Sequence, residues 1–414
     1  YGNIYFKNDS SHMFMIGPTI KELKITSKPK KTEYTVGETF DPTGLKVEAV
    51  YSTGKTRDIT KYIDYNKNPL SLDDEDFEIR FKTGTQMYQD RDGKTGVTYT
   101  PPTAFLDLTI KLKNKEEPPK EPLRLAGEDR YETAIKIADA LKKEQGKDKF
   151  DTAVVAYGDN YADALSGAYL AKVNNAPLLL VNRNNTEQTI KYIQANLRPG
   201  KSSKVYLLGE SDVVPEVVRT RLDGNFTVKR LAGEDRFATN LAILKEAKVN
   251  NEEILVCSGY GFADSLSASA TGRPLLLVGK TLTAEQIAYL KSIRSRNYTL
   301  IGDSGTVSSA VETSLRGLGK VGRVFGADRF ETSVAVAKHF FKNPKSVVIG
   351  YGGNFPDGLC GGVLAEKRGA PLLLINERNT EFAKQYVKEN SIKDQIVLGD
   401  SDLISDRAIN AIVK

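Results

Sequence analysis

The chain has 414 residues, enough for three or four domains, and its 40% hydrophobic content is typical of a globular protein with a sizeable core. Its net charge of +6 would suit an acidic partner, but acidic residues are interspersed throughout, and we expect no nucleic-acid partner. No apolar run is long enough to span a membrane, and two cysteines and two histidines favour neither a disulfide framework nor a metal site.

The first part of the chain has a β pattern. Residues 1–18 show no periodicity, and we interpret them as the tail of an upstream module or a remnant of expression. Residues 19–113 contain short alternating strands, such as Lys46–Tyr51 and Ala104–Leu112, separated by Gly, Pro and Asp turns. This pattern predicts a β-sandwich. The charged, proline-rich residues 114–122 predict an extended linker.

One run in the β region is more specific than the general pattern. Residues 31–47 combine a tyrosine with Val-Gly-Glu and Gly-Leu elements, and a Tyr-Ser-x-Gly turn follows at 51–54. This combination resembles the bacterial immunoglobulin-like domains of surface proteins, over residues 19–113. The resemblance implies an all-β domain that acts as a spacer or contacts other proteins.

The rest of the chain repeats one phrase three times. The first copy reads Arg-Leu-Ala-Gly-Glu-Asp-Arg-Tyr-Glu-Thr from Arg124, and related copies start at Arg230 and Arg323. The copies are about 100 residues apart, far more than in solenoid repeats, so each copy predicts a small domain. The predicted units are residues 123–226, 227–320 and 321–414.

Each unit has the same predicted order of elements. An amphipathic helix follows the Asp-Arg phrase, and an apolar strand then ends in a glycine turn and a helix of small residues. A Pro-Leu-Leu-Leu strand, a polar loop, a third helix and a last strand complete the unit. Thr186, Thr283 and Thr380 are placed as N-caps of the third helix. Continuous apolar strands that alternate with helices predict parallel sheets covered on both faces.

The three ordered motifs resemble the cell wall binding repeat 2 family over residues 123–414. The resemblance implies Rossmann-like or Toprim-like α/β units around a pseudo-threefold axis. It also implies a secreted protein of the cell wall or S-layer surface of a Gram-positive bacterium, non-covalently anchored to an anionic cell-wall polysaccharide, with other surface-layer proteins as further partners. No enzymatic activity, cofactor or metal is implied. The third copy departs from the pattern at Val324, Phe325 and Pro356, so we expect its polymer site to differ.

The candidate polymer contacts lie in loops that follow the strands. In open α/β sheets, ligands bind at the carboxyl ends of the strands, where backbone N–H groups and guanidinium groups can hold phosphate or carboxylate. Glu377 interrupts the basic position after the Pro-Leu-Leu-Leu strand in the third copy. The candidate polymer-binding residues are Arg130, Arg236, Arg329, Asn160, Asn182, Arg183, Lys280, Asn354 and Asn376.

The same motif also has a purely structural interpretation. The recurring aspartates open a helix and could cap it, and the arginines could pair with a second set of aspartates within a unit or across to its neighbour. The first set is Asp129, Asp235 and Asp328, and the second is Asp163, Asp264 and Asp357. Both interpretations of the arginines stay open at the level of sequence.

Two other classes of function compete with wall anchoring. A nucleotide-binding or Toprim-style metal enzyme is disfavoured, because GxGxxG is absent and the Asp-x-Asp pair at Asp400 and Asp402 is not repeated in the other units. A structural lattice or adhesion protein, whose repeats contact protein rather than polymer, is the remaining alternative.

Overall fold

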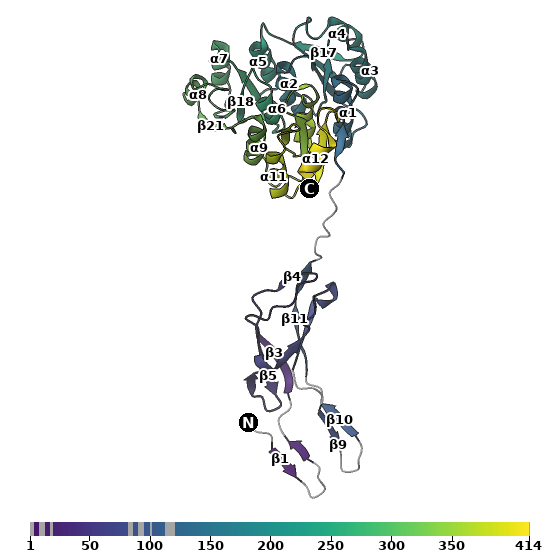
Figure 1. Cartoon of the computed structure of the whole chain (residues 1–414), viewed down its shortest axis with the longest axis vertical. Coiled ribbons are helices and arrows are strands. Elements are labelled where there is room, and N and C mark those ends of the chain that lie inside the picture. Colours follow the sequence, from purple (N-terminus) through teal and green to yellow (C-terminus); the bar gives the residue numbers. More distant parts are fainter. Residues whose placement is uncertain are drawn as a thin grey trace. The chain divides into compact units, whose positions relative to one another are not determined.

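The chain folds into two compact units, Tyr1–Glu117 and Pro118–Lys414 (Figure 1). The structure is a computed structural model, which describes residues 4–7, 13–16, 20–81, 86–89, 95–99, 102–111 and 121–413. Most of the predicted linker 114–122 lies outside the described residues. Each unit is considered by itself.

The first unit consists of short, mostly antiparallel strands. One sheet has the order β3-β5-β6, a second has the order β11-β8-β7, and β12 pairs in parallel with β4. The strands of these sheets are β3 (Ile20–Ser27), β4 (Glu33–Thr35), β5 (Lys46–Tyr51), β6 (Thr56–Asp58), β7 (Ile63–Tyr65), β8 (Asp76–Phe81), β11 (Ala104–Asp107) and β12 (Thr109–Lys111). Two further antiparallel pairs are β1 (Ile4–Lys7) with β2 (Met13–Ile16) and β9 (Gln86–Gln89) with β10 (Thr95–Tyr99).

The core of this unit follows from strand alternation. Val47 and Ala49 of β5 are fully buried while their neighbours are not, and Phe40 stacks on Phe77 with ring centroids 4.3 Å apart. The predicted strand Ala104–Leu112 is interrupted at Leu108, whose N–H group donates to the carbonyl oxygen of Glu75. This break lets one stretch of chain join two different sheets.

The second unit contains three four-stranded parallel sheets in its described part. Their strand orders are β15-β14-β16-β17, β19-β18-β20-β21 and β23-β22-β24-β13. The strands are β13 (Leu123–Leu125), β14 (Thr152–Tyr157), β15 (Leu178–Val181), β16 (Lys204–Leu208), β17 (Thr227–Leu231), β18 (Ile254–Ser258), β19 (Leu275–Val278), β20 (Asn297–Ile301), β21 (Lys320–Val324), β22 (Ser346–Tyr351), β23 (Leu372–Ile375) and β24 (Asp394–Leu398). The Pro-Leu-Leu-Leu strands are buried along their whole length, as predicted.

Helices connect and cover these strands. In the first copy they are α1 (Arg130–Glu144), α2 (Ala162–Val173), α3 (Glu187–Asn196) and α4 (Glu216–Leu222). In the second they are α5 (Arg236–Glu246), α6 (Ala263–Ser269), α7 (Ala284–Ser292) and α8 (Ser309–Arg316). In the third they are α9 (Arg329–Phe340), α10 (Gly361–Lys367), α11 (Glu381–Glu389) and α12 (Asp406–Val413). No helix among the described residues is long and apolar enough to cross a membrane.

Each copy gives its opening strand to the sheet of its neighbour. Strand β17 opens the second copy of the repeated phrase but pairs with β16 of the first, and β21 pairs with β20 in the same way. Strand β13, at the start of the array, pairs with β24 near its end. The exchange is therefore cyclic, and the two ends of the array are joined in one sheet.

The first arginine of the repeated phrase secures this exchange. Arg124 donates to the carbonyl oxygens of Gly399 and Ile404 and to Asp406, at 2.8–3.0 Å. The equivalent Arg230 and Arg323 donate to the carbonyl oxygens of the corresponding glycines and to glutamates of α4 and α8. Because these are bonds from a cation to carbonyls and carboxylates, they hold each exchanged strand against the sheet it completes.

The three helices of small residues meet at the centre of the unit. Helices α2, α6 and α10 contact one another, and each also contacts the first helix of the next copy: α2 with α5, α6 with α9 and α10 with α1. Equivalent aromatic rings precede these helices, and the centroids of Tyr161, Phe262 and Phe355 are 5.5–6.1 Å apart in all three pairs. This closed triangle marks the pseudo-threefold axis that the family resemblance implies.

Candidate functional site at the contacts between repeats

The aspartates of the repeated phrase cap the first helix of each copy. Asp129 accepts hydrogen bonds from the N–H groups of Tyr131 and Glu132 at 2.9 and 2.8 Å. Asp235 and Asp328 accept the equivalent bonds at the start of α5 and α9. These carboxylates satisfy N–H groups that would otherwise lack a partner at the helix N-terminus, so their first role is structural.

The glycine and threonine of the phrase fold the turn before the helix. The N–H group of Gly127 donates to the hydroxyl oxygen of Thr133 at 3.0 Å, and the two other copies have the same bond. A Cβ atom at Gly127 would lie 2.4 Å from that of Glu132. Glycine is therefore required for this turn, which leads into the helix that begins at the next arginine.

The three equivalent arginines share one contact. Each donates through Nη1 to a glycine carbonyl oxygen at the end of a central strand: Arg130 to Gly158, Arg236 to Gly259 and Arg329 to Gly352. Their remaining surroundings differ between copies, because the residue after that glycine is Asp159, Tyr260 or Gly353.

In the first copy the arginine is engaged by an acid. Asp159 lies 3.3 Å from Nη1 of Arg130 and also accepts bonds from the hydroxyl of Tyr131 and the amide of Asn182, both at 2.9 Å. Three donors therefore converge on one carboxylate. The negative charge of Asp159 offsets the charge of the Arg130 guanidinium, which makes this arginine less attractive to an anionic ligand.

In the second and third copies the guanidinium lies near aromatic rings instead. Arg236 is 5.7 Å from the ring centroid of Tyr161 and 5.9 Å from that of Tyr260. Arg329 lies 5.2 Å from the ring centroid of Phe262 and makes no hydrogen bond in the described structure besides that to Gly352. Arg329 is the most available of the three.

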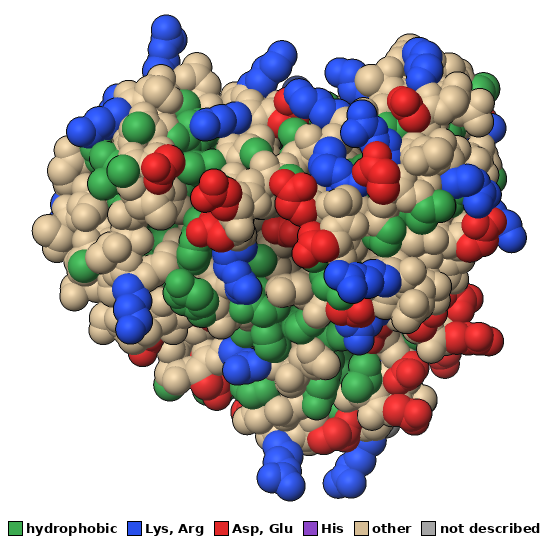
Figure 2. Space-filling model, turned by 90° about the horizontal axis from the view of Figure 1, so that it is seen from above, with side chains coloured by type: hydrophobic (Ala, Val, Ile, Leu, Met, Phe, Trp, Pro, Cys, Tyr) green, Lys and Arg blue, Asp and Glu red, His purple; other side chains and the backbone are tan. Residues whose placement is uncertain are grey.

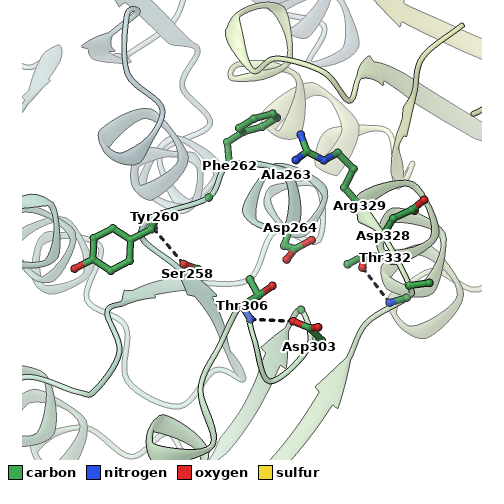
Figure 3. Close-up of a pocket in the computed structure, with 14 residues that line it drawn as sticks. Ser258, Tyr260, Phe262, Ala263, Asp264, Asp303, Thr306, Asp328, Arg329 and Thr332 are labelled. Carbon is green, nitrogen blue, oxygen red and sulfur yellow. Dashed lines mark hydrogen bonds between the residues drawn. The ribbon is translucent and has the colours of Figure 1, made fainter. Parts of the chain in front are cut away.

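A cavity opens beside Arg329, between the second and third copies (Figure 3). Its volume is about 360 Å³, and it lies where β18, β20 and β21 end. Figure 3 shows the Asp264 carboxylate at its centre, with Arg329 opposite and Thr306 and Asp303 below. Parallel sheets bind ligands at this edge.

The Asp264 carboxylate is held in an unfavourable environment. Burial raises its pKa to about 6; the charge of Arg329 opposes this rise and the charge of Asp303 adds to it. Asp264 and Arg329 form no ion pair in the described structure. The carboxylate packs against Gly302, where an added Cβ would lie 2.6 Å from Oδ2 and where φ is +107°.

The other two contacts between copies repeat this pattern. Burial raises the pKa of Asp163 to about 6, and the charge of Arg236 opposes the rise. Burial also raises the pKa of Asp357, against a hydrogen bond from Thr133 and the charge of Arg130. Each carboxylate thus faces the arginine of the next copy. The sequence placed both residue types correctly in their motifs but could not show that they meet across copies.

The side-chain oxygens of the asparagines predicted as polymer contacts accept hydrogen bonds within local turns. Asn160 and Asn354 accept from the N–H group of the following aromatic residue at 2.7 and 2.9 Å. Asn182 accepts from two N–H groups of its own loop, and Asn376 does the same. These asparagines therefore shape the loops at the strand ends.

The basic loop positions have separate environments. Arg183 donates through Nε to the carbonyl oxygen of Asp212 at 3.0 Å. Lys280 is exposed, and its carbonyl oxygen accepts from Ser308. In the third copy Glu377 accepts from the N–H group and the hydroxyl of Ser405, and so ties this loop to the N-terminus of α12.

Within the described residues no cluster of three or more His, Cys, Asp or Glu side chains could hold a metal ion. Asp400, of the Asp-x-Asp pair, accepts from the N–H groups of Asp402 and Leu403 at 3.0 and 3.2 Å. That carboxylate therefore forms a turn. Cys257 and Cys360 are buried free thiols.

The fold defines a class: a closed ring of three α/β repeats, with a cavity at the strand ends where the second and third copies meet. Residues 124–219, 230–312 and 323–409 match the cell wall binding domain 2 (CWB2) family, and residues 27–102 match the bacterial Ig-like domain, group 3. The three stretches make up more than half of the chain. The protein therefore belongs to the cell wall binding domain 2 family, which confirms the resemblance and makes it a cell-wall-binding protein.

The chain is also similar to individual proteins of known sequence or structure. The chain is 25% identical over 316 residues to the N-acetylmuramoyl-L-alanine amidase LytC of Bacillus subtilis, covering 75% of this chain and 59% of that protein. It is similar in fold to Cwp8 from Clostridium difficile, with a TM-score of 0.63, 24% identity and coverage of 81% of this chain and 58% of that one. Cwp6 from Clostridium difficile matches with a TM-score of 0.60, 21% identity and coverage of 94% and 67%. The chain thus spans about three fifths of LytC and of Cwp8.

Proposed function

We propose that the three repeats anchor a secreted surface protein non-covalently to an anionic polysaccharide of a Gram-positive cell wall. Binding rather than catalysis is the proposed role of this chain. The cavity beside Arg329 carries the proposal, because it combines an available guanidinium with hydroxyl, carboxylate and aromatic groups at the ligand-binding edge of the sheets.

The guanidinium supplies the contact to an anion. Arg329 uses Nη1 for Gly352, and its other N–H groups remain for a phosphate or carboxylate of the polymer. Basic and acidic side chains intermingle on the face shown in Figure 2, so this face has no uniformly basic surface that would attract an anion. Recognition therefore depends on the local site.

The other groups of the cavity suit sugar units. Asp264 and Asp303 can accept hydrogen bonds from sugar hydroxyls, and the exposed ring of Tyr260 offers a flat apolar face. An acidic group bound by Arg329 would also favour protonation of Asp264, because it adds negative charge nearby. Carboxylates and an anion-binding arginine can therefore serve one polymer.

The three contacts between copies are not equivalent in this proposal. Arg130 is engaged by Asp159, whereas Arg329 faces an open cavity. We assign the principal site to the contact between the second and third copies. The contact between the third and first copies then acts mainly to close the ring.

Co-sedimentation tests the proposed partner. The whole chain is expected to pellet with deproteinised walls, and to stay in solution with walls from which the anionic polysaccharide has been chemically removed. Purified polysaccharide in solution should compete with intact walls. Equal pelleting with both wall preparations would contradict the proposal, and binding only to walls that retain their surface proteins would favour the lattice alternative.

A further inference from the structure

A second cavity lies on the outside of the third repeat, away from the contacts between copies. Its volume is about 480 Å³, and it is formed where α9 and α11 end side by side (Figure 1). Lys338, Lys342 and Asn343 line it from the first segment, and Tyr386 and Glu389 from the second. The function proposed above does not use these residues.

The cavity exists because α9 is shorter than its equivalent in the first copy. Helix α1 continues to Glu144, whereas α9 ends at Phe340, shortly before Pro344, which disfavours helical backbone in the residue before it. In the first copy this extra turn carries Lys142. Its ammonium donates to the side-chain oxygen of Asn196 at 2.5 Å, at the end of α3.

One buried tyrosine recurs in this region of each copy. In the first copy the hydroxyl of Tyr192 donates to the carboxylate of Asp139 at 2.8 Å. In the third copy Lys338 occupies the position of that aspartate, ten residues after the capping aspartate. Tyr386 is 1% exposed, and its hydroxyl has no hydrogen-bond partner in the structure. A buried hydroxyl group without a hydrogen-bond partner destabilises the folded state. In the first copy, the carboxylate of Asp139 accepts the hydrogen bond of the equivalent hydroxyl.

The charges around the third-copy cavity favour an anion. The ammonium of Lys338 lies 3.1 Å from Glu389, whose other oxygen accepts from Gln385 at 2.8 Å. Lys342 is exposed and has no partner within the described residues. Lys342 therefore adds one positive charge, not paired with any acidic side chain that the structure describes, to the cavity that Tyr386 also lines. Burial raises the pKa of Tyr386 to about 12, so its hydroxyl remains a donor at neutral pH.

We propose that this cavity of the third repeat binds an anionic group, a carboxylate or a phosphate, which takes the place that Asp139 holds in the first repeat. Lys342 supplies the charge, and the Tyr386 hydroxyl donates the hydrogen bond. The site is separate from the cavity beside Arg329, and it does not require that the ligand be the wall polymer.

Thermal unfolding with two probes tests this site. Sodium phosphate and sodium glucuronate are titrated against the whole chain, with sodium chloride added to hold ionic strength constant. Either probe is expected to raise the Tm of the wild type by a few degrees in a saturable manner, because a ligand of the native state stabilises it. Lys342→Gln and Tyr386→Phe should each remove most of that shift.

Two matched variants serve as controls. Lys143→Gln changes the equivalent lysine of the first copy, and Tyr289→Phe removes a second buried hydroxyl that has no partner. Both should keep the wild-type shift. A response to phosphate alone assigns phosphate as the ligand group, a response to glucuronate alone assigns a carboxylate, and a response to both assigns an anion in general. Because the Arg329 site would bind the same probes, the variants are also compared in an Arg329→Gln background. The absence of a shift, or a shift that persists in Lys342→Gln and Tyr386→Phe in that background, would overturn the proposal.

Discussion

Removal of strand β13 is expected to lower the Tm of the second unit by roughly 10 °C. A chain that starts at residue 126 loses the pairing with β24, the buried side chain of Leu125 and the three bonds of Arg124. Burial of a leucine contributes about 2 kcal/mol and bonds from a charged group a similar amount, so the loss is about 4 kcal/mol. Each kcal/mol corresponds to about 2–4 °C in a domain of this size. Calorimetry of residues 121–414 and 126–414 measures the difference.

A permuted chain provides the control for this prediction. Strand β17 follows α4 after a short connection, residues 223–226, and it completes the first sheet. Moving residues 121–126 to the C-terminus, behind α12 and a connection of the same length, recreates this order in the third copy. The permuted chain should regain the Tm of residues 121–414. A truncated chain as stable as the complete one would show that the ring is not held closed by this strand.

Asp264→Asn is expected to stabilise the protein at neutral pH by as much as about 3 kcal/mol. The folded-state pKa of Asp264, about 6, lies above the ordinary value of 3.8 for an aspartate. A carboxyl group whose pKa is higher in the folded state than in the unfolded state contributes its full stability below the unfolded-state pKa. That contribution to the free energy of unfolding is lost as the pH rises through the folded-state pKa. Each unit of pKa difference corresponds to about 1.4 kcal/mol. An amide cannot ionise, so the variant should escape this loss. Urea unfolding at pH 7.5 and at pH 4 measures it.

Asp303→Asn is the matched control in the same cavity. Hydrogen bonds from Thr306 lower the pKa of Asp303, so its charge stabilises the folded state above the unfolded pKa. Asp303→Asn should therefore have a lower free energy of unfolding than the wild type at pH 7.5. The difference between the two proteins should be smaller at pH 4. If Asp264→Asn is no more stable than the wild type at pH 7.5, the carboxylate is not held under strain as described.

The order of elements in the repeats could be predicted because the apolar strands and the motif spacing are local signals. Which strands share a sheet could not be predicted from the sequence. Strand β21, Lys320–Val324, contains the start of the third copy of the phrase, yet it pairs with β20 and completes the second sheet. The sequence of a strand does not determine which strand it pairs with. The same limit hid the role of Arg124, whose acceptors lie at the other end of the chain.

Helix caps were only partly predictable. Thr186, Thr283 and Thr380 all occupy N-cap positions, but only the side chain of Thr283 accepts a hydrogen bond, from Gln286. Thr283 has extended backbone angles, as an N-cap requires, whereas the other two have helical ones. Residue type alone does not determine that difference.

The candidate site was predictable as a region but not in its detail. The three arginines are the first residues of α1, α5 and α9, and their different surroundings follow from Asp159, Tyr260 and Gly353, which occupy one position in the three copies. That variation is visible in the sequence. Its meaning needed the structure, because only the geometry shows that this residue faces the guanidinium.

The affinity of Arg329→Gln for purified anionic wall polysaccharide tests the central claim most directly. The wild type is expected to bind, and to bind more weakly as chloride is raised, because exposed charges are screened within about 8 Å at 0.15 M salt. Loss of a charged hydrogen bond should weaken binding by Arg329→Gln about tenfold and flatten its salt dependence. Arg219→Gln, the same change at an exposed site of α4, should bind as the wild type does. Equal affinity and equal salt dependence of Arg329→Gln and the wild type would contradict the account.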